Sequence, residues 1–280
     1  EDMPDGRVKH IVQNITDPDI VPYIPDGIGN STDRQRIPAV LIIPGGAFRR
    51  LVYNFEGEDV AKWLNSMGIA AFVLECRLPS DEHDNAEDVP LIDAMRAMRV
   101  IRGRAQEFGI DEAKIGVMGF SAGGFMAALL STAYESDVYA DYKYKDEYDK
   151  LSARPDFAVC SYPVISIDDC IEAGKRYMSE EQVLERISDG KAKILHKYNP
   201  DKLVRPDMPP VFICETDDDR TTLSENSVGF YMAARKAGVS AELHIFRTGG
   251  HGYGCGDDFA QTGEWKVLFT KWIKSIGIIS

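Results

Sequence analysis

Uninterrupted apolar runs mark the strands that this sequence predicts. Residues 39–43 and 69–75 are apolar at nearly every position, as expected for strands that are buried on both faces. Residues 114–120 have the same character and lead directly into a run of good helix formers. Further strands are predicted at 157–160, 211–214 and 241–246, and residues 8–16 and 20–25 favour short strands of an antiparallel edge.

Helical periodicity separates these runs. Apolar residues between Leu91 and Phe108 recur every three or four positions, which places them on one face of a helix over 90–108 that Gly109 ends. Because helices alternate with buried strands, we expect a mostly parallel central sheet with right-handed crossovers. No internal repeat or linker interrupts the pattern, so residues 1–280 are predicted to form a single domain. The other predicted helices cover 58–67, 122–130, 225–237 and 258–276.

Two segments are not accounted for by the predicted strands and the helices that connect them. Residues 134–150 carry five tyrosines among alternating charges, and residues 167–199 favour one or two inserted helices. Insertions that follow the strands of an open α/β sheet overhang the carboxyl edge of that sheet, where ligands bind. We therefore expect a helical insertion over the site at about 167–199. For the tyrosines, stacking on a sugar or aromatic acyl group and a solvated surface remain equal alternatives.

Composition narrows the possible functions. A chain with 44% hydrophobic and 28% charged residues is typical of globular proteins, and no apolar run approaches the roughly 18 residues of a membrane span. The net charge of −13 argues against nucleic acid and anionic membranes as partners. The five cysteines lack metal-type spacing. Cys76, Cys160 and Cys214 end strand-like runs, which favours buried free thiols, while pairing among the five stays open.

Ser121 is the candidate nucleophile. It lies at the apex of Gly119-Phe120-Ser121-Ala122-Gly123, between a buried strand and a helix. A serine in this strand–turn–helix setting projects its hydroxyl from a strained backbone, and larger side chains at Gly119 or Gly123 would collide. The amides and positive dipole end of the following helix suit an oxygen that becomes negatively charged.

A serine hydroxyl needs a base and an acid that orients this base. His251 follows the last predicted strand within a glycine-rich loop, Gly249-Gly250-His251-Gly252, that lets an imidazole reach back across the strand ends. The acid is expected after the strand at 211–214, where Asp217, Asp218 and Asp219 stand side by side. Their spacing alone does not choose among them. The chain order serine, aspartate, histidine is that of the α/β-hydrolases.

Backbone amides are the candidate oxyanion donors. One is the N–H of Ala122, directly after the candidate nucleophile, and the others are Gly46 and Ala47 in the turn that follows the strand at 39–43. Losing one such donor typically raises a barrier by about 3–4 kcal/mol. The aspartates at 217–219 have no partner ligands at metal-type spacing, so we expect neither a metal site nor a cofactor.

The sequence resembles the α/β-hydrolase fold serine esterases, within them the group that includes bacterial acetylxylan and feruloyl esterases. The resemblance covers about 39–254, and the stretches that carry it include PGGAF at 44–48, EGEDVAKWLNSMGIAAFVLECRLP at 56–79, PLIDAMRAMRVIR at 90–102, KIGVMGFSAGG at 114–124, SARPDFAVCSYPVIS at 152–166, PPVFICETDDD at 209–219 and GGHGYG at 249–254. It implies a triad of Ser121, Asp218 and His251, so that Asp218 is the aspartate that orients the base. Departures at Pro44, Phe125 and Arg220 concern substrate and loop shape more than the triad.

The resemblance implies a serine esterase that works through an acyl-enzyme and removes acetyl or feruloyl groups from xylan or a related oligosaccharide ester. Two alternatives remain: a peptidase of the prolyl oligopeptidase-like type, and a non-catalytic carbohydrate-binding protein on the same scaffold. A polysaccharide substrate, together with a chain that begins at Glu1 rather than Met, favours a secreted or periplasmic protein over a cytoplasmic one. The acyl group, the sugar and the oligomeric state stay open.

Overall fold

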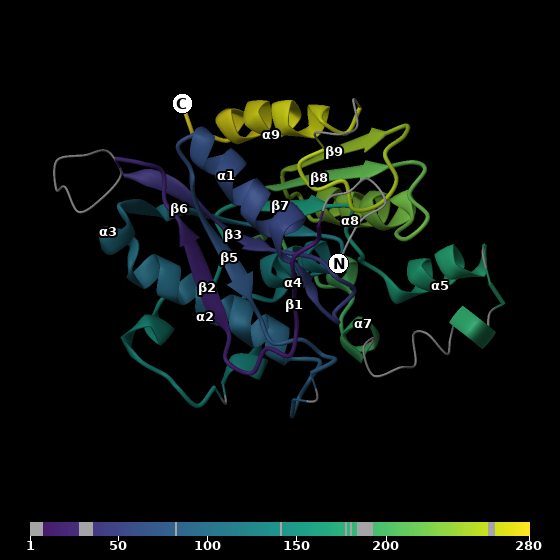
Figure 1. The fold of residues 1–280 in the computed structure, drawn as a ribbon, viewed down its shortest axis with the longest axis horizontal. Helices are drawn as coiled ribbons and strands as arrows, with labels where there is room; N and C mark the ends of the chain where they lie inside the picture. Colours follow the sequence, from purple (N-terminus) through teal and green to yellow (C-terminus); the bar gives the residue numbers. More distant parts are fainter. Residues whose placement is uncertain are drawn as a thin grey trace.

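A seven-stranded sheet forms the centre of the structure (Figure 1). The computed structural model describes residues 8–27, 36–81, 83–140, 142–176, 178–179, 181–183, 193–256 and 261–280. Neighbouring strands run parallel except at one edge, where β2 is antiparallel to β5. The strands, in spatial order, are β2 (Asp19–Tyr23), β5 (Ala70–Glu75), β3 (Ile37–Ile43), β6 (Ile110–Phe120), β7 (Ala158–Ser161), β8 (Val211–Thr216) and β9 (Ala241–Phe246).

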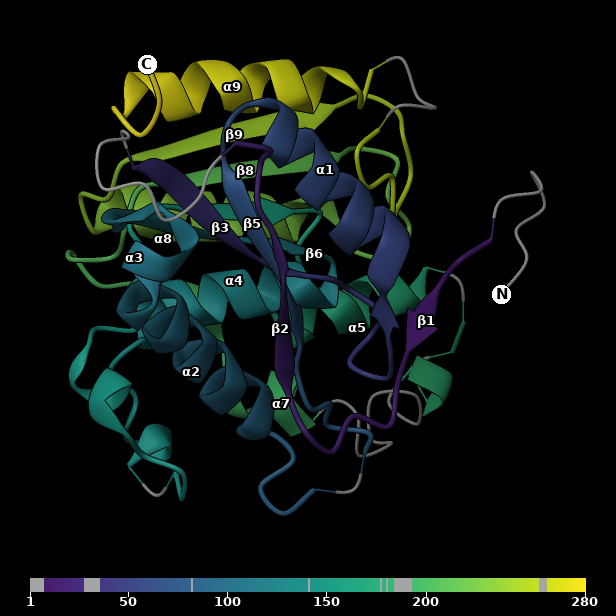
Figure 2. The same ribbon diagram turned by 60° about the vertical axis from the view of Figure 1, so that its left-hand side comes forward.

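Helices cover both faces of this sheet (Figures 1 and 2). Along β3, the side chains of Leu41 and Ile43 pack toward one face and those of Val40 and Ile42 toward the other, which explains the uninterrupted apolar run. The first face is covered by α2 (Val89–Gly103), α4 (Ala122–Ala133) and α8 (Ser224–Lys236), and the second by α1 (Asp59–Ser66) and α9 (Glu264–Ser275). The mostly parallel α/β architecture predicted from the sequence is confirmed.

The strand order reverses its direction between β3 and β6. From β3 the chain crosses through α1 to β5 on one side, whereas from β6 it crosses through α4 to β7 on the other side. Because these two connections leave in opposite directions, the carboxyl ends of β3 and β6 form the switch point at which open α/β sheets bind ligands. The turn at 44–49 and Ser121 both lie at this switch point.

The boundaries differ from the sequence prediction in two places. The helix expected over 90–108 breaks at Arg104 into α2 and the short α3 (Ala105–Phe108), and Gly109 ends it in a left-handed conformation with φ of 68°. The strand expected over 8–16 is reduced to β1 (Ile11–Val12), paired with β4 (Leu51–Val52), because Asn14 adopts a positive φ. The first residues of the helix predicted over 258–276, 258–260, lie outside the described residues.

The expected insertion over 167–199 is helical where it is described. It contains α5 (Ile167–Lys175) and α7 (Lys193–Lys197), while most of the chain between them lies outside the described residues. Helix α7 buries Ile194 and Leu195 in the core, and Tyr198, just beyond it, donates a hydrogen bond to Asp88 at the start of α2. This part of the insertion is therefore anchored to the fold. Its place over the site stays a prediction.

The tyrosine-rich segment packs on α2. It contains two short 3₁₀ turns, η2 (Asp137–Tyr139) and η3 (Glu147–Lys150). The guanidinium of Arg99 lies 4.1 Å from the ring centre of Tyr139, and Arg96 forms an ion pair of 2.5 Å with Asp146. These contacts hold the segment against α2. The side chain of Tyr144, by contrast, is 77% exposed.

Within the described part of the chain, no helix is both long and apolar enough to cross a bilayer. Cys76, Cys160 and Cys214 are buried free thiols, and Cys255 is also buried. Desolvation in these apolar surroundings raises the pKa of Cys76, Cys160 and Cys214, so these thiols stay protonated. The expectation of buried free thiols at the ends of strands is confirmed for Cys76, Cys160 and Cys214.

Candidate active site

The turn from β6 into α4 holds Ser121 in a strained conformation, with φ of 53° and ψ of −118°. A Cβ atom added to Gly119 would lie 1.9 Å from the carbonyl oxygen of Gly123, and one added to Gly123 would lie 1.9 Å from that of Ile43. Both positions therefore require glycine, as the sequence predicts. The tight turn leaves Ser121 8% exposed at the N-terminus of α4.

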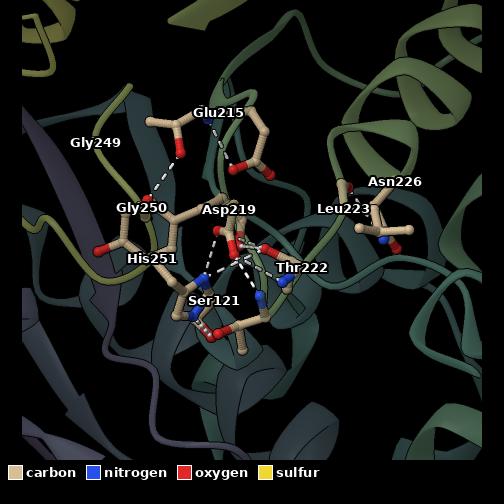
Figure 3. Close-up of polar contacts among 12 residues, drawn as sticks. Ser121, Glu215, Asp219, Thr222, Leu223, Asn226, Gly249, Gly250 and His251 are labelled. Atoms are coloured by element: carbon tan, nitrogen blue, oxygen red, sulfur yellow. Dashed lines mark hydrogen bonds and ion pairs between the residues drawn. The ribbon is translucent and has the colours of Figure 1, made fainter. Parts of the chain in front are cut away.

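The imidazole of His251 joins Ser121 to an aspartate (Figure 3). Its Nε2 lies 2.9 Å from Ser121 Oγ, and its Nδ1 lies 2.6 Å from a carboxylate oxygen of Asp219. With a proton on Nδ1, this ring donates to the carboxylate and accepts from the serine hydroxyl, the tautomer that a general base needs. The structure thus brings together two residues, Ser121 and His251, that stand 130 positions apart in sequence.

The aspartate at the imidazole is Asp219, so the expectation for Asp218 is wrong. The amide of Asp219 donates to the carbonyl of Thr216, which closes a turn directly after β8. Residues 217 and 218 form the exposed corner of this turn, whereas the side chain of Asp219 points inward and is 4% exposed. In a tight turn, neighbouring side chains point in different directions. The positions of three adjacent aspartates in the sequence therefore do not show which of them points inward.

Asp218 supports the histidine loop instead. One of its carboxylate oxygens accepts the N–H groups of Gly249 and Gly250, at 2.9 and 2.8 Å. The hydroxyl of Thr216 donates to the carbonyl of Gly250 at 2.8 Å. Together these bonds fix the backbone that carries His251.

Asp219 is held as an anion by several donors. The amides of Thr221 and Thr222 donate to one carboxylate oxygen at 2.7 and 2.9 Å, and the Thr222 hydroxyl lies 3.0 Å from the other. Burial by itself raises the pKa of Asp219, but the hydrogen bond and charge of His251 and these amides outweigh burial and lower it. The carboxylate therefore remains charged and fixes the orientation of the imidazole.

Glu215, at the end of β8, is a second buried acid behind the site. Its carboxylate accepts from the amide of Thr216 at 2.9 Å and from the hydroxyl of Ser227 at 3.2 Å. Desolvation and the nearby charge of Asp219 raise its pKa well above the usual value. Glu215 therefore takes up a proton more readily than Asp219, and Asp219 is the carboxylate that contacts the imidazole.

The turn after β3 lies directly against the candidate nucleophile. A Cβ atom at Gly45 would come within 2.9 Å of Ser121 Cβ, and at Gly46 within 2.0 Å of the Arg50 carbonyl oxygen. Gly46 has a φ of 141°, and Ala47 has a left-handed φ of 57°. Ala122 is the first residue of α4, where an N–H has no acceptor within the helix. The three predicted oxyanion residues thus lie in the two segments that meet at Ser121.

A small cavity lies behind this turn. It is apolar and leaves about 10 Å³ for the centre of a water-sized group, which is room for about one such group. Its walls include Gly46 and Ala122 from the oxyanion segments, together with Leu78, Pro90 and Met126. Among the described residues, no group of three His, Cys, Asp or Glu side chains is placed to hold a metal ion.

The sequence of the BD-FAE family matches residues 28–233, which is more than half of the chain. The chain belongs to the BD-FAE family. An acetylxylan esterase from Xylanibacter ruminicola is 31% identical over 240 residues, 85% of this chain and 45% of the relative. Endo-1,4-beta-xylanase B from Butyrivibrio fibrisolvens is 31% identical over 227 residues, 81% of this chain and 34% of the relative. This BD-FAE chain therefore spans less than half the length of these two relatives.

Solved structures agree with the fold of this BD-FAE chain. An acetyl ester-xyloside bifunctional hydrolase from Caldicellulosiruptor lactoaceticus is 35% identical, with a TM-score of 0.76 and coverage of 97% of this chain and 98% of that one. The carboxylesterase Cest-2923 from Lactobacillus plantarum, at 20% identity, has a TM-score of 0.77 over 98% of both chains and shows the fold alone. The resemblance inferred from the sequence motifs, an α/β-hydrolase of the acetylxylan and feruloyl esterase group, is confirmed.

Four side chains of this BD-FAE site were not predicted from the sequence. They are Glu56 and Tyr162, which lie behind the triad, and Thr222 and Glu215, which surround Asp219. Glu56 and Tyr162 fall in stretches that resemble the family, EGEDVAKWLNSMG and SARPDFAVCSYPVIS. The resemblance was the signal that could have pointed to Glu56 and Tyr162. It assigned neither residue a role, because their contacts join loops that are distant in sequence.

Proposed function

We propose that this chain is a serine carboxylic ester hydrolase that removes acetyl groups from xylan or xylo-oligosaccharides through an acyl-enzyme. The observation that carries this proposal is the pair of contacts made by His251, 2.9 Å to the hydroxyl of Ser121 and 2.6 Å to the carboxylate of Asp219. Ser121, His251 and Asp219 then act as nucleophile, general base and orienting acid. The two relatives named for xylan-directed activities and the acetyl ester-xyloside hydrolase support the substrate class.

Each step follows from this geometry. Ser121 Oγ attacks the ester carbonyl carbon and passes its proton to Nε2 of His251. The carbonyl oxygen becomes an oxyanion, which the N–H groups of Ala122 and of the Gly46–Ala47 turn stabilise. When the tetrahedral intermediate collapses, the sugar oxygen leaves with the proton from His251, and an acetyl group remains on Ser121. A water molecule then repeats the sequence and releases acetate.

The small cavity favours acetyl over feruloyl. The carbonyl carbon on Ser121 Oγ carries both the oxyanion and the acyl substituent, so this substituent begins beside the amides of Gly46 and Ala122. These two residues form part of the wall of the cavity, which has room for about one water-sized group and therefore suits a methyl group better than an aromatic ring. Acetylated xylo-oligosaccharides should therefore be better substrates than feruloylated ones.

Changing Ser121 to alanine tests the proposal. The variant should lose at least about a thousandfold in kcat/KM on acetylated xylo-oligosaccharides and on 4-nitrophenyl acetate, with thermal unfolding close to that of the wild type. A fluorophosphonate probe should label the wild type at Ser121 and leave the variant unlabelled. A wild type that binds xylo-oligosaccharide yet takes no label would favour a non-catalytic carbohydrate-binding protein, and faster turnover of aminoacyl anilides than of esters would favour a peptidase.

A further inference from the structure

Glu56 is a carboxylate buried behind the oxyanion turn. It lies in a single π-helical turn, η1 (Asn54–Glu58), that leads into α1, and it is 5% exposed. One carboxylate oxygen accepts the N–H of Gly45 at 2.8 Å, and the other accepts the hydroxyl of Tyr162 at 2.9 Å. Both oxygens act as acceptors, which suits an ionised carboxylate. π-Helical turns within α-helical segments are frequent at functional sites.

Tyr162 extends this contact to the histidine loop. It follows β7, is fully buried, and its hydroxyl oxygen accepts the N–H of Gly254 at 3.0 Å. Its ring also meets the imidazole of His251 edge-on, with 5.0 Å between the ring centres. A continuous path of hydrogen bonds therefore runs from Gly45, through Glu56 and Tyr162, to Gly254. It joins the two segments that flank Ser121.

We propose that Glu56 is a positioning residue that acts through this path, holding the oxyanion turn and the histidine loop at a fixed separation around Ser121. The inference rests on the proposed esterase function. Oxyanion donors must lie within about 2.7–3.1 Å of the charge that develops, and a misplacement of about 1 Å can reduce the rate by about a hundredfold. By accepting the Gly45 N–H, Glu56 fixes the peptide units that immediately precede Gly46 and Ala47.

The energetics support a functional role. Desolvation raises the pKa of Glu56, although the Tyr162 hydroxyl, the charge of His251 and the Gly45 amide act in the opposite direction. A buried carboxylate is costly, and an apolar side chain of similar size often gives equal or greater stability. The positive charge on His251 acts to lower the pKa of Glu56, so the ionised form of Glu56 and the imidazolium that forms when His251 takes up the serine proton stabilise each other.

The first test is Glu56→Gln in the full chain. A glutamine has one oxygen acceptor, so either the Gly45 N–H or the Tyr162 hydroxyl proton loses its partner. We expect kcat on 4-nitrophenyl acetate to fall about tenfold to a hundredfold, with KM within about threefold of the wild type. Phosphonylation of Ser121 by a fluorophosphonate should slow by a similar factor, because it also places charge in the oxyanion site.

Asp156→Asn is the matched control. The Asp156 carboxylate accepts from the Ile115 amide at 2.9 Å, at the middle of β6, and forms an ion pair with Arg102 at 3.0 Å. Ser121 lies beyond the carboxyl end of the same strand. Its loss should lower stability and leave kcat unchanged. A purely structural role for Glu56 predicts the same pattern in Glu56→Gln.

Two outcomes would overturn the inference. One is a folded Glu56→Gln variant, checked by circular dichroism, with kcat and phosphonylation rate within twofold of the wild type. If this variant does not fold, Tyr162→Phe replaces it, because it keeps the bond from Gly45 to Glu56 and removes the bond from Gly254. The second outcome that would overturn the inference is a folded Tyr162→Phe variant whose kcat equals that of the wild type. If the wild type itself neither turns over esters nor takes the label, the proposed function fails first.

Discussion

The middle and the carboxyl end of strand β6 show how one element can serve stability and chemistry separately. At its middle, the polar contacts are ordinary: Asp156 accepts a hydrogen bond from the amide of Ile115 and pairs with Arg102, and the side chain of Asp156 remains partly exposed. At its carboxyl end, Ser121 adopts a strained positive φ, and the buried carboxylates of Glu56 and Asp219 lie behind it. Strain and buried charge are costly to a fold, and their concentration at one end of the strand marks that end as the site.

The largest expected effect is a loss of kcat when the triad at the carboxyl end of β6 is changed. Asp219→Asn should lower kcat by about a thousandfold to ten-thousandfold, because an amide favours the wrong imidazole tautomer and leaves the imidazolium without its counter-charge. Asp218→Asn should cost less than about tenfold, since its amide oxygen still accepts the N–H groups of Gly249 and Gly250. Steady-state kinetics on 4-nitrophenyl acetate measures both. Equal losses would mean that Asp219 has no special role.

Changes in the cavity wall should alter specificity rather than abolish activity. Leu78→Ala should raise the ratio of kcat/KM for butyrate over acetate 4-nitrophenyl esters by about tenfold, because it widens the space behind the oxyanion turn. The expected cost is about 2–5 kcal/mol of folding free energy, because Leu78 is buried. An unchanged ratio in a folded variant would place the acyl group elsewhere.

At the middle of β6, Asp156→Asn should lower stability and spare activity, the opposite of what is expected for Asp219→Asn. It should reduce the free energy of unfolding by about 1 kcal/mol through the weakened ion pair and hydrogen bond. Its kcat should remain within twofold of the wild type, because Ser121 lies beyond the carboxyl end of the strand and Asp156 makes none of the contacts of the triad. Urea denaturation and ester kinetics on the same preparation test both statements. A large loss of kcat would show that the two regions are coupled.

The pH dependence of stability should give the smallest signal. The pKa of Asp219 is lower in the folded protein than its usual value of 3.8, so this carboxylate contributes stability above that value and loses the contribution as the pH falls through its folded pKa. The difference in unfolding free energy between the wild type and Asp219→Asn should therefore shrink below about pH 4. Urea denaturation between pH 3 and 7 measures it, and a difference that grows toward acid would contradict the sign.

Much of the fold was predictable because its signals are local. Uninterrupted apolar runs at 39–43 and 69–75 identified buried strands, and glycines two positions on either side of Ser121 identified the sharp turn from strand to helix. Steric exclusion at these glycines acts over a few neighbouring residues, so the sequence records it directly. The break at Arg104 is different, because Gly103 beside it permits a break but does not require one.

By itself, the sequence determined the α/β order of the elements, the candidate nucleophile Ser121 and the candidate base His251. Only the tertiary structure decided that Asp219 rather than Asp218 reaches the imidazole, because the turn after β8 and its bonds to the loop after β9 set the side-chain directions. The path through Glu56 is likewise tertiary, since Glu56 and Tyr162 are 106 positions apart. A linear pattern records which residues can do chemistry, while the packing of distant loops determines which atoms lie within hydrogen-bond distance.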